Sequence, residues 1–324
     1  MNDPKICIIG AGVLSSRRIY PYIGAAGGQL AGVCDIDTEK AERNARRFGG
    51  KVYNDYNVMI ENEKPDGVII CINAEKHALM AMEIMKKNIP VYTEKPPAVS
   101  AAAALETARI SKETGVLCST AFKKRYNTAY SKAKNWLDKF DPSELCCISV
   151  DYSSMPYKNE GLRTFLFDFA IHIIDLTVYL FGNVKQVFCF SKGSNAYAVS
   201  LKFENGAVGS LSLTDTRAAG VPTEEVEISV QDSNFMTVHN SSCWKITEKG
   251  KPCEWREPPT YTSGGDSGNE TGHLAEIADF FDAIKNNRTT RSNIYESYKT
   301  MVLYEAIKKS SETGEIVDIH YEIL

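Results

Sequence analysis

Residues 5–37 read KICIIGAGVLSSRRIYPYIGAAGGQLAGVCDID and decide the fold. Lys5–Ile9 is short and apolar, as expected for a strand that is buried on both faces. A glycine-rich turn, Gly10–Ser15, follows it, and a helical stretch then leads to a second buried strand, Leu30–Asp35. In this order of strand, turn, helix and strand, a glycine-rich turn predicts a dinucleotide site.

The residues of the turn have separate predicted tasks. Gly10 permits the tight turn, and Gly12 lets the backbone approach a pyrophosphate. A helix that begins near Val13 offers free N–H groups, including that of Leu14, and the positive end of its dipole to this anion.

Two further residues bear on this interpretation. Ser15 stands where the third glycine of the pattern is usual, and it is small enough for helix and strand to pack closely. Asp35 ends the second strand, which is where the carboxylate of this pattern binds ribose hydroxyls. The alternative is an ordinary tight turn between strand and helix, but the flanking strands and Asp35 favour a dinucleotide.

Length and composition indicate a soluble globular protein of two domains. The chain has 324 residues, of which 43% are hydrophobic and 24% charged. Its net charge of −4 gives no electrostatic reason to expect nucleic acid or an anionic membrane as a partner. The first strand leaves no room for a signal peptide, and the nine cysteines are scattered, so a cytoplasmic protein with reduced thiols is expected. No metal site is predicted, because the chain has no CxxC motif and its histidines are dispersed.

Strand and helix alternate through the first third of the chain. Four more strands are predicted, at Val52–Tyr53, Gly67–Cys71, Pro90–Thr93 and Gly115–Cys118. Such alternation produces a parallel sheet whose ligands lie beyond the carboxyl ends of the strands. We therefore assign residues 1–120 to an α/β Rossmann dinucleotide-binding domain.

The pattern changes after about residue 120, where strands follow one another without helices between them. This succession predicts that residues 121–324 form an α+β domain with a large, mainly antiparallel sheet, for substrate binding and oligomerisation. The closing helix could pack back on the first domain. The expected elements are Tyr126–Phe140, Leu145–Tyr152, Phe165–Phe181, Val184–Phe190, Ala196–Phe203, Ala207–Thr214, Glu224–Val230, Phe235–Val238, Trp244–Thr247, His273–Lys285 and Tyr295–Ser311, with a mobile loop at Thr260–Gly268.

Two motifs carry candidate chemistry. Lys95 lies in TEKPP, at the end of the fifth strand, where Pro96 favours an extended Lys95 at the mouth of the cofactor crevice. The alternative is a solvated loop lysine. Asp168, His172 and Asp175 are spaced i, i+4, i+7 on an otherwise apolar helix, which predicts one polar stripe. They form either a structural Asp–His pair or a general base, His172, oriented by Asp168.

Together these stretches resemble the Gfo/Idh/MocA oxidoreductases, named for glucose–fructose oxidoreductase and inositol dehydrogenase. The resemblance covers essentially the whole chain and rests on ICIIGAGVLS, GVCDID, TEKPP, D-x-x-x-H-x-x-D and EAIKKSSETGEIVDI. It implies that Lys95, Asp168 and His172 form the catalytic group, which also contacts substrate. It further implies that Arg125 faces the cofactor or substrate, and it places three more residues with Lys95 on the cofactor side: Asn73, His77 and Glu94.

The chain departs from the family pattern in two places. Asn73-Ala74 replaces the Thr-Pro of many members, and bulky residues, including Arg163, replace a glycine-rich segment before Asp168. Arg163 is expected on the approach to the site, where it binds either a substrate carboxylate or phosphate, or a nearby acid such as Glu160.

The expected activity is hydride transfer between a sugar, cyclitol or related polyol and a nicotinamide cofactor. In this reaction we expect His172 to take the hydroxyl proton, Lys95 to stabilise the alkoxide, and Asp168 to orient His172 and support its charge. NAD is favoured over NADP because Asp35 would repel a 2′-phosphate. An NAD-dependent glycosidase of the same fold and a non-catalytic ligand sensor are the alternatives.

Self-association is also expected, as a homodimer or homotetramer built on the sheet of the second domain. Runs such as VSLKF, VGSLSL and VEISV are rich in apolar residues and predict an apolar spare face.

Overall fold

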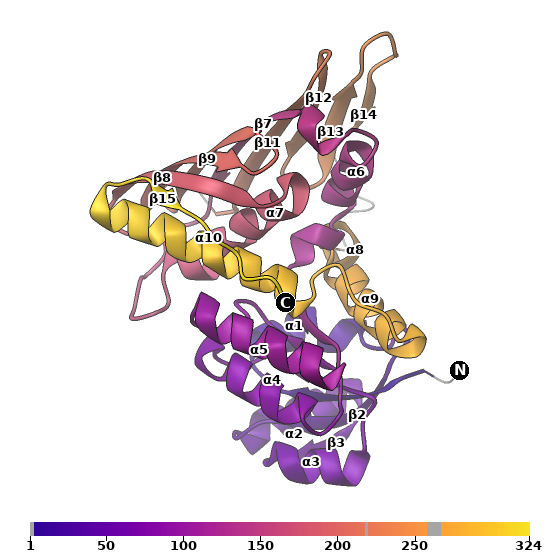
Figure 1. Cartoon of the computed structure of the whole chain (residues 1–324). Coiled ribbons are helices and arrows are strands. Elements are labelled where there is room, and N and C mark those ends of the chain that lie inside the picture. Colours follow the sequence, from indigo (N-terminus) through magenta and orange to yellow (C-terminus); the bar gives the residue numbers. More distant parts are fainter. Residues whose placement is uncertain (1–2, 218–219, 258–266) are drawn as a thin grey trace. The chain divides into compact units, whose positions relative to one another are not determined.

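The computed structural model describes residues 3–217, 220–257 and 267–324. The chain divides into two compact units, each with its own sheet (Figure 1). Unit 1 comprises Met1–Lys123, Gly272–Tyr298 and Leu324, and unit 2 comprises Lys124–Thr271 and Lys299–Ile323.

Unit 1 is built on a six-stranded parallel sheet in the order β3-β2-β1-β4-β5-β6. This is the strand order of a doubly wound dinucleotide-binding fold, so the predicted α/β Rossmann class is confirmed. The order reverses between β1 and β4, and ligands of such sheets bind at that point, beyond the carboxyl ends. The elements are β1 (Lys5–Ile9), α1 (Val13–Arg18), β2 (Gln29–Cys34), α2 (Thr38–Phe48), β3 (Lys51–Tyr53), α3 (Tyr56–Glu63), β4 (Gly67–Ile70), α4 (His77–Met85), β5 (Val91–Thr93), α5 (Ala101–Thr114), β6 (Cys118–Thr120) and α9 (His273–Asn286).

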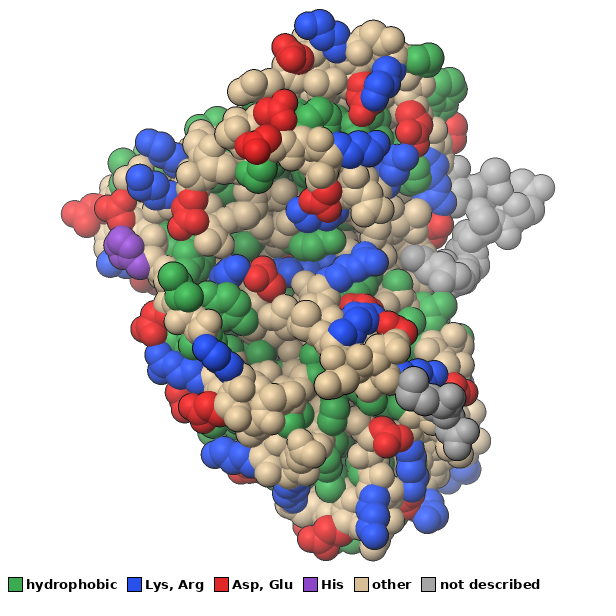
Figure 2. All heavy atoms as spheres, turned by 45° about the vertical axis from the view of Figure 1, so that its right-hand side comes forward, with side chains coloured by type: hydrophobic (Ala, Val, Ile, Leu, Met, Phe, Trp, Pro, Cys, Tyr) green, Lys and Arg blue, Asp and Glu red, His purple; other side chains and the backbone are tan. Residues whose placement is uncertain are grey.

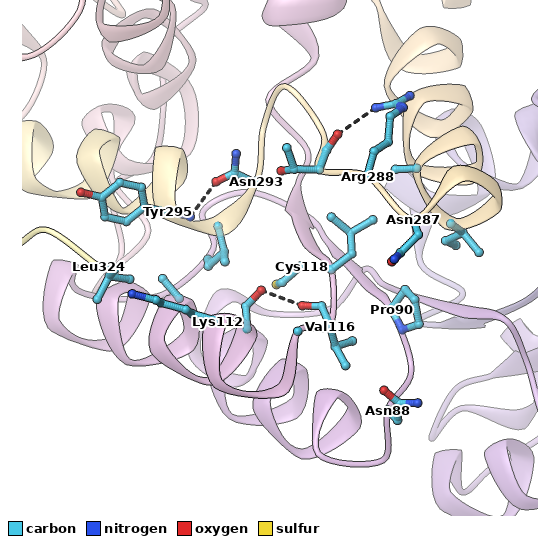
Figure 3. Close-up of a pocket in the computed structure, with 18 residues that line it drawn as sticks. Asn88, Pro90, Lys112, Val116, Cys118, Asn287, Arg288, Asn293, Tyr295 and Leu324 are labelled. Atoms are coloured by element: carbon cyan, nitrogen blue, oxygen red, sulfur yellow. Dashed lines mark hydrogen bonds between the residues drawn. The ribbon is translucent and has the colours of Figure 1, made fainter.

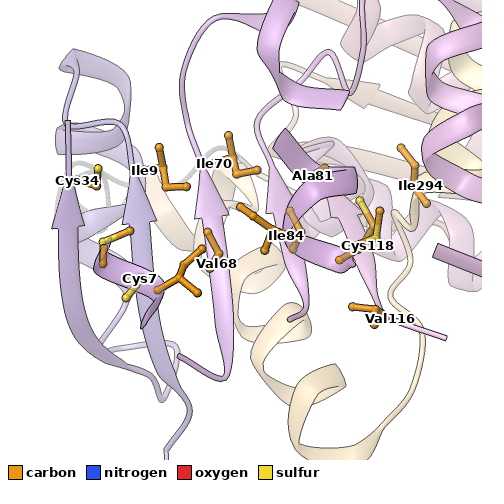
Figure 4. Close-up of a cluster of buried hydrophobic side chains, with 14 of the residues drawn as sticks. Cys7, Ile9, Cys34, Val68, Ile70, Ala81, Ile84, Val116, Cys118 and Ile294 are labelled. Atoms are coloured by element: carbon orange, nitrogen blue, oxygen red, sulfur yellow. The ribbon is translucent and has the colours of Figure 1, made fainter. Parts of the chain in front are cut away.

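The central strand β1 is buried on both faces, as its composition predicts. On one face, Cys7 and Ile9 pack with Val68, Ile70 and Ile84 (Figure 4). Each isoleucine buried in this way contributes roughly 1.5–3 kcal/mol to stability.

The other face of the same sheet explains why a late segment of the chain belongs to unit 1. Ile6 and Ile8 pack there in one cluster with Phe280 and Phe281 of α9. Residues 272–298 therefore complete the hydrophobic core of the first sheet, although residues 145–256, which carry all but the last strand of the sheet of unit 2, separate them in sequence from β6.

The sixth strand begins later than the sequence predicts. It lies at Cys118–Thr120 and not at Gly115–Cys118. Gly115 has φ +68° and caps the C-terminus of α5, and the Ser111 hydroxyl donates to the carbonyl of Val116 at 2.6 Å. These residues end the helix before the strand can begin.

Unit 2 contains a nine-stranded sheet in the order β14-β13-β12-β11-β7-β10-β9-β8-β15. β7 and β10 pair in parallel and the other neighbours are antiparallel, which confirms the mainly antiparallel sheet. α6, α7 and α10 cover one face (Figure 1). The elements are α6 (Thr128–Leu137), β7 (Leu145–Ser153), α7 (Ile171–Phe181), β8 (Val184–Lys192), β9 (Ala196–Phe203), β10 (Val208–Thr214), β11 (Thr223–Val230), β12 (Asn234–His239), β13 (Cys243–Thr247), β14 (Glu254–Arg256), α8 (Ser267–Thr271), α10 (Ile294–Thr313) and β15 (Val317–Asp318).

Three details of unit 2 extend or limit the prediction. The sequence does not predict β14 and β15, because such short strands carry too little alternation to be recognised. The division between the units falls within α10. Residues 260–266 of the predicted loop lie outside the described residues, and Ser267 begins α8.

The uncovered face of this sheet is polar, so the expectation of an apolar spare face was wrong. All apolar residues of the quoted runs except Val208 alternate onto the buried face, as Leu201, Leu211 and Ile228 do. The exposed face carries serines and charges instead, and apolar side chains are few there. Across the sheet, one row of paired residues is Phe188, Ser200, Ser210, Ser149, Glu227, Thr237, Lys245 and Trp255.

Charged side chains of both signs are interspersed over the face seen in Figure 2, in keeping with a net charge of −4. In the part of the chain that the structure describes, no helix is both long enough and apolar enough to cross a membrane.

Candidate active site

The glycine turn after β1 requires glycine at one position and leaves open space at the other. Gly10 has φ +105°, and a Cβ there would lie 2.0 Å from the carbonyl oxygen of Cys71, so only glycine fits. A Cβ on Gly12 would meet no protein atom within 4 Å. Glycine is therefore required at position 10 by protein packing. Gly12 instead leaves open the space beside the backbone where a ligand would approach.

The turn is fixed by hydrogen bonds to its own backbone. The N–H of Ala11 donates to Oδ2 of Asp35 at 2.7 Å, and Nδ2 of the buried Asn44 donates to the carbonyl of Ala11 at 3.1 Å. Oδ1 of Asp35 also accepts the N–H of Asp37 at 2.9 Å. Asp35 thus ties the end of β2 to the glycine turn, a task that the sequence pattern did not reveal.

These features fit a dinucleotide. The first turn of α1 presents Val13, 70% exposed, and Leu14 to solvent beside the open space at Gly12. Ser15 is fully buried, as close packing at the third position requires. The backbone of the turn is accessible to an anion beside Gly12, and Asp35 stands at the carboxyl end of β2 with both carboxylate oxygens on backbone N–H groups.

His77 joins the segment after β4 to the segment that carries Lys95. It is buried, with Nδ1 2.8 Å from the carbonyl oxygen of Pro96 and Nε2 3.1 Å from that of Ile72. A neutral imidazole can donate through only one of these nitrogens. Burial lowers the pKa of His77. Asn73 is exposed and precedes the short 3₁₀ helix Ala74–Lys76.

Lys95 follows β5 at the carboxyl end of the sheet, as predicted, and is partly buried. The buried carboxylate of Glu94 accepts the backbone N–H of Lys95 at 3.1 Å through Oε2. Burial raises the pKa of Glu94, and the positive charges of Lys95 and Lys123 act in the opposite direction. The Lys95–Pro96 peptide bond is cis, which the sequence did not indicate.

In unit 2, the helix of Asp168 begins with an irregular turn. Thr164 precedes it, with its Oγ1 accepting the N–H of Phe167 at 3.2 Å and its carbonyl accepting the N–H of Asp168 at 2.8 Å. Leu166–Ala170 then forms a π-helical turn that leads into α7. Asp168 lies in that turn, a feature that is frequent at functional sites.

Asp168 is held by two side chains from the preceding segment. The Tyr157 hydroxyl donates to Oδ2, and Nε of Arg163 donates to the same oxygen at 3.1 Å. Burial and the neighbouring Asp168 raise the pKa of Tyr157. Arg163 exchanges backbone hydrogen bonds with Glu160, but its ion pair is with Asp168.

The predicted polar stripe is divided between different partners. His172 is partly exposed. Asp175 is fully buried and binds Arg125, whose Nε and Nη2 lie 2.7–3.2 Å from its carboxylate oxygens, and it also accepts the Thr300 hydroxyl at 2.8 Å. Arg125, which the resemblance assigns to cofactor or substrate, is 1% exposed and forms this buried ion pair.

Sequence reasoning missed the residues that hold these groups. Tyr157 precedes Asp168 by eleven positions, and the turn signals at Pro156 and Gly161 were the only local indication that its segment folds back. Asn44 and Thr300 are ordinary helix residues by pattern, and nothing in the sequence marks their partners.

Both halves of the chain match one oxidoreductase family. Residues 4–122 match its domain described as "NAD-binding Rossmann fold", and residues 153–319 match its C-terminal alpha/beta domain. The chain belongs to the Gfo/Idh/MocA oxidoreductase family. The predicted family and the fold of both domains are confirmed.

Relatives of this Gfo/Idh/MocA protein carry dehydrogenase names. It is 21% identical to D-apiose dehydrogenase of Rhizobium rhizogenes over 98% of both chains. It is 29% identical to glucose-6-phosphate 3-dehydrogenase of Bacillus subtilis over 55% of this chain and 53% of that one. An oxidoreductase from Agrobacterium radiobacter, solved with NAD+, L-tartaric acid and magnesium, has the same fold, with a TM-score of 0.87, 18% identity and coverage of 98% of both chains.

A separate cavity of about 730 Å³ lies at the other end of the first sheet (Figure 3). Pro90 and Val116, which precede β5 and β6, line it with Asn287 and Asn293. It opens at the amino ends of the strands, whereas the glycine turn and Lys95 stand at the carboxyl ends.

Among the described residues, no group of three His, Cys, Asp or Glu side chains is arranged to hold a metal ion.

Proposed function

We propose that this oxidoreductase oxidises a secondary alcohol of a sugar, cyclitol or related polyol with NAD. The observation that carries the proposal is that Asp168 and His172 lie at the start of an otherwise buried helix, in a chain whose other unit has the dinucleotide-binding fold with Lys95 after β5. The dehydrogenase names of the relatives, for apiose and glucose 6-phosphate, support this substrate class.

Each proposed catalytic residue has one task. His172 takes the hydroxyl proton, and the Lys95 ammonium stabilises the negative charge that develops on the same oxygen. Asp168 supports His172 and is itself fixed by Tyr157 and Arg163. Bound NAD supplies the hydride acceptor.

The cofactor would be held mainly by backbone groups. Gly10 and Gly12 shape the turn around the pyrophosphate, with the N–H groups of Val13 and Leu14 facing it, and Asp35 binds ribose hydroxyls. We place Asn73, His77, Glu94 and Lys95 on the same side. Since both ring nitrogens of His77 face backbone carbonyls, we propose that it contributes by holding the backbone on either side of the cofactor.

NAD is favoured over NADP by the charges after β2. Asp35 would repel a 2′-phosphate. Lys40, the nearest cation that follows, forms an ion pair with Asp37 at 2.9 Å. Calorimetric titration of both cofactors into the cofactor-free protein tests this preference, and tighter binding of NADP would contradict it.

The decisive experiment is a screen of sugars and cyclitols for NADH formation. Lys95→Ala and His172→Ala should each lower turnover by about 10²–10⁴-fold while NAD affinity changes little. His239→Ala, on an exposed strand position, is the matched control and should retain activity. Wild-type turnover of His172→Ala would refute the assignment, and substrate consumption without net NADH would indicate the glycosidase.

We also propose that the chain self-associates through the uncovered face of the nine-stranded sheet. The support is that no described helix covers this face and that Phe190 and Trp255 are exposed towards its two ends. Light scattering at micromolar concentration should give the mass of a dimer or tetramer, and a monomeric mass would contradict the proposal.

A further inference from the structure

Arg163 carries a guanidinium that is anchored at one nitrogen and exposed elsewhere. Its Nε donates to Oδ2 of Asp168 at 3.1 Å, in a hydrogen bond that is also an ion pair, and the guanidinium interacts with the Tyr157 side chain as well. The side chain is 72% exposed, against 16% for Asp168. Because a guanidinium has five N–H donors in one plane, most of its donors are available to a ligand.

The anchor fixes the direction of the guanidinium. The Tyr157 hydroxyl donates to the same oxygen of Asp168, so the carboxylate that holds Nε is itself held from a second side. A guanidinium that is fixed in this way loses less rotational freedom when it binds a ligand than a mobile side chain does.

The charges around Arg163 favour an anionic ligand. Arg163 immediately precedes Thr164, at the N-terminal end of the Asp168 helix, where the helix dipole attracts negative charge. The same dipole disfavours an arginine at this position, and Asp168 supplies only one compensating carboxylate. An incoming anion would gain from both the guanidinium and the helix end.

We propose that Arg163 makes this enzyme selective for acidic substrates, namely sugars or polyols that carry a carboxylate or a phosphate. The Nη1 and Nη2 groups would donate to two oxygens of the anionic group, while Nε stays on Asp168. The inference rests on the proposed function, because that function places Asp168 in the active site. It sets the substrate's anionic end beside Asp168 and directs the neutral part of the molecule towards His172.

Matched pairs of acidic and neutral sugars test this selectivity. The probes are glucuronate and glucose 6-phosphate, each compared with glucose, and galacturonate compared with galactose. In the wild type, kcat/KM should be higher for the acid of a pair, and the preferred probe shows whether a carboxylate or a phosphate is recognised. Arg163→Gln should lower kcat/KM for the acid by about 10–100-fold more than for the neutral sugar, as expected for lost hydrogen bonds to a charged group.

Three further variants separate recognition by Arg163 from other effects. Arg163→Lys keeps the charge but loses the planar fork, and it should retain only part of the acid preference. Tyr157→Phe removes the other donor to Asp168 and loosens the carboxylate that anchors Arg163, so it should lower kcat/KM for both sugars and reduce the acid preference less than Arg163→Gln does. Lys158→Gln removes an exposed cation from the same segment and should leave the acid-to-neutral ratio unchanged.

The possible outcomes distinguish a failure of this inference from a failure of the proposed function. NADH formation with equal rates for acids and neutral sugars would overturn the inference and leave the proposed function standing. An equal loss of selectivity in Lys158→Gln and Arg163→Gln would also overturn it, since general charge attraction would then suffice. If no sugar yields NADH, the proposed function fails, and calorimetric binding of glucuronate and glucose 6-phosphate to the NAD-loaded protein decides the inference. Binding that Arg163→Gln abolishes would support it, and an absence of binding would overturn it.

Discussion

The glycine turn of unit 1 and the Asp168 helix of unit 2 are held by different kinds of contact. In the turn, side chains bind the main chain: Asp35 accepts the N–H of Ala11, and Asn44 donates to the carbonyl of the same residue. In the helix, side chains bind side chains: Tyr157 and Arg163 donate to Asp168.

This difference decides what a sequence can reveal. The local glycine pattern largely specifies the conformation of the turn, but it does not mark Asn44 or the second role of Asp35 as the side chains that hold it. Contacts between side chains depend on partners elsewhere in the chain, such as Arg125 and Thr300, which reach Asp175 over separations of 50 and 125 residues. If the two kinds of contact differ in this way, they should also respond differently to mutation.

The largest loss of stability is expected from the buried side-chain pair. Arg125→Met leaves Asp175 buried without its guanidinium, and breaking such a pair typically costs about 3–5 kcal/mol. Urea denaturation measures the free energy of unfolding. The matched control is Arg217→Met, which breaks the exposed pair with Asp151 and should cost about 0–1 kcal/mol. Similar losses in both variants would show that burial does not govern the effect.

The two glycines of the turn should separate stability from cofactor binding. Gly10→Ala places a Cβ against the Cys71 carbonyl at a positive φ, and we expect a loss of about 1–3 kcal/mol in the free energy of unfolding. Gly12→Ala meets no protein atom and should leave stability unchanged while weakening NAD binding. Thermal unfolding and NAD titration of both variants provide the measurement. A stable Gly10→Ala variant with normal NAD affinity would contradict the structural role of Gly10.

Acid should destabilise unit 1 through its buried histidines. Burial, assisted by the positive charges of Lys123 and Arg18, lowers the pKa of His273 to about 2 from an ordinary value of 6.5. Between these values the unfolded chain binds a proton that the folded chain does not, so stability is complete above pH 6.5 and falls as the pH decreases. The slope is about 1.4 kcal/mol per pH unit for each such proton.

A pH series of urea denaturation from about 7.5 to about 5 tests this slope. His273→Gln should reduce it by about one proton's contribution, or about 1.4 kcal/mol per pH unit. His77, whose pKa burial also lowers, should contribute in the same direction. His239, which is half exposed in unit 2, is the control, and an equal effect of His239→Gln would contradict the burial argument.

The smallest effect is expected from one of several bonds to the glycine turn. The Tyr20 hydroxyl donates to the carbonyl of Gly10 at 3.2 Å. Tyr20→Phe removes this bond and should cost roughly 0.5–1.5 kcal/mol in unfolding free energy, measured by urea denaturation. NAD affinity should change less than in Gly12→Ala, because Asp35 and Asn44 still hold the turn. A loss as large as that of Arg125→Met would show that the turn depends on this single bond.

The predictable parts of the molecule are those that local patterns specify. Lys5–Ile9 is recognisable as a doubly buried strand, and the glycine turn and the position of Lys95 follow from the same sheet. The helix over 165–181 follows from its apolar run. The ion pair of Arg163 does not follow, because Glu160 and Asp168 are both within reach in sequence and only the folded loop selects between them.

The uncovered face of the nine-stranded sheet shows a second property that the sequence alone does not predict, namely its polarity. Counting apolar residues in VGSLSL or VEISV does not tell which face they occupy, because alternation gives all of them except Val208 to the buried side. Only the pairing of Ser200, Ser210 and Ser149 across three strands shows that the other side is hydroxyl-rich. An interface on that face would be hydrogen-bonded and hydrated, with little apolar area to bury.

The π-helical turn at Leu166–Ala170 affects where two carboxylates lie around the helix axis. In regular α-helical winding, residues seven apart lie within about 20° of each other around the axis, so Asp168 and Asp175 would lie on one side of the helix. The extra residue in the turn changes the phase between them, and one carboxylate is fully buried while the other reaches the surface. A substitution of Asp168 or of Asp175 can therefore leave the contacts of the other residue unchanged. A chain that lost one residue here would regain regular winding, and Asp168 would return to the side of the helix that carries Asp175.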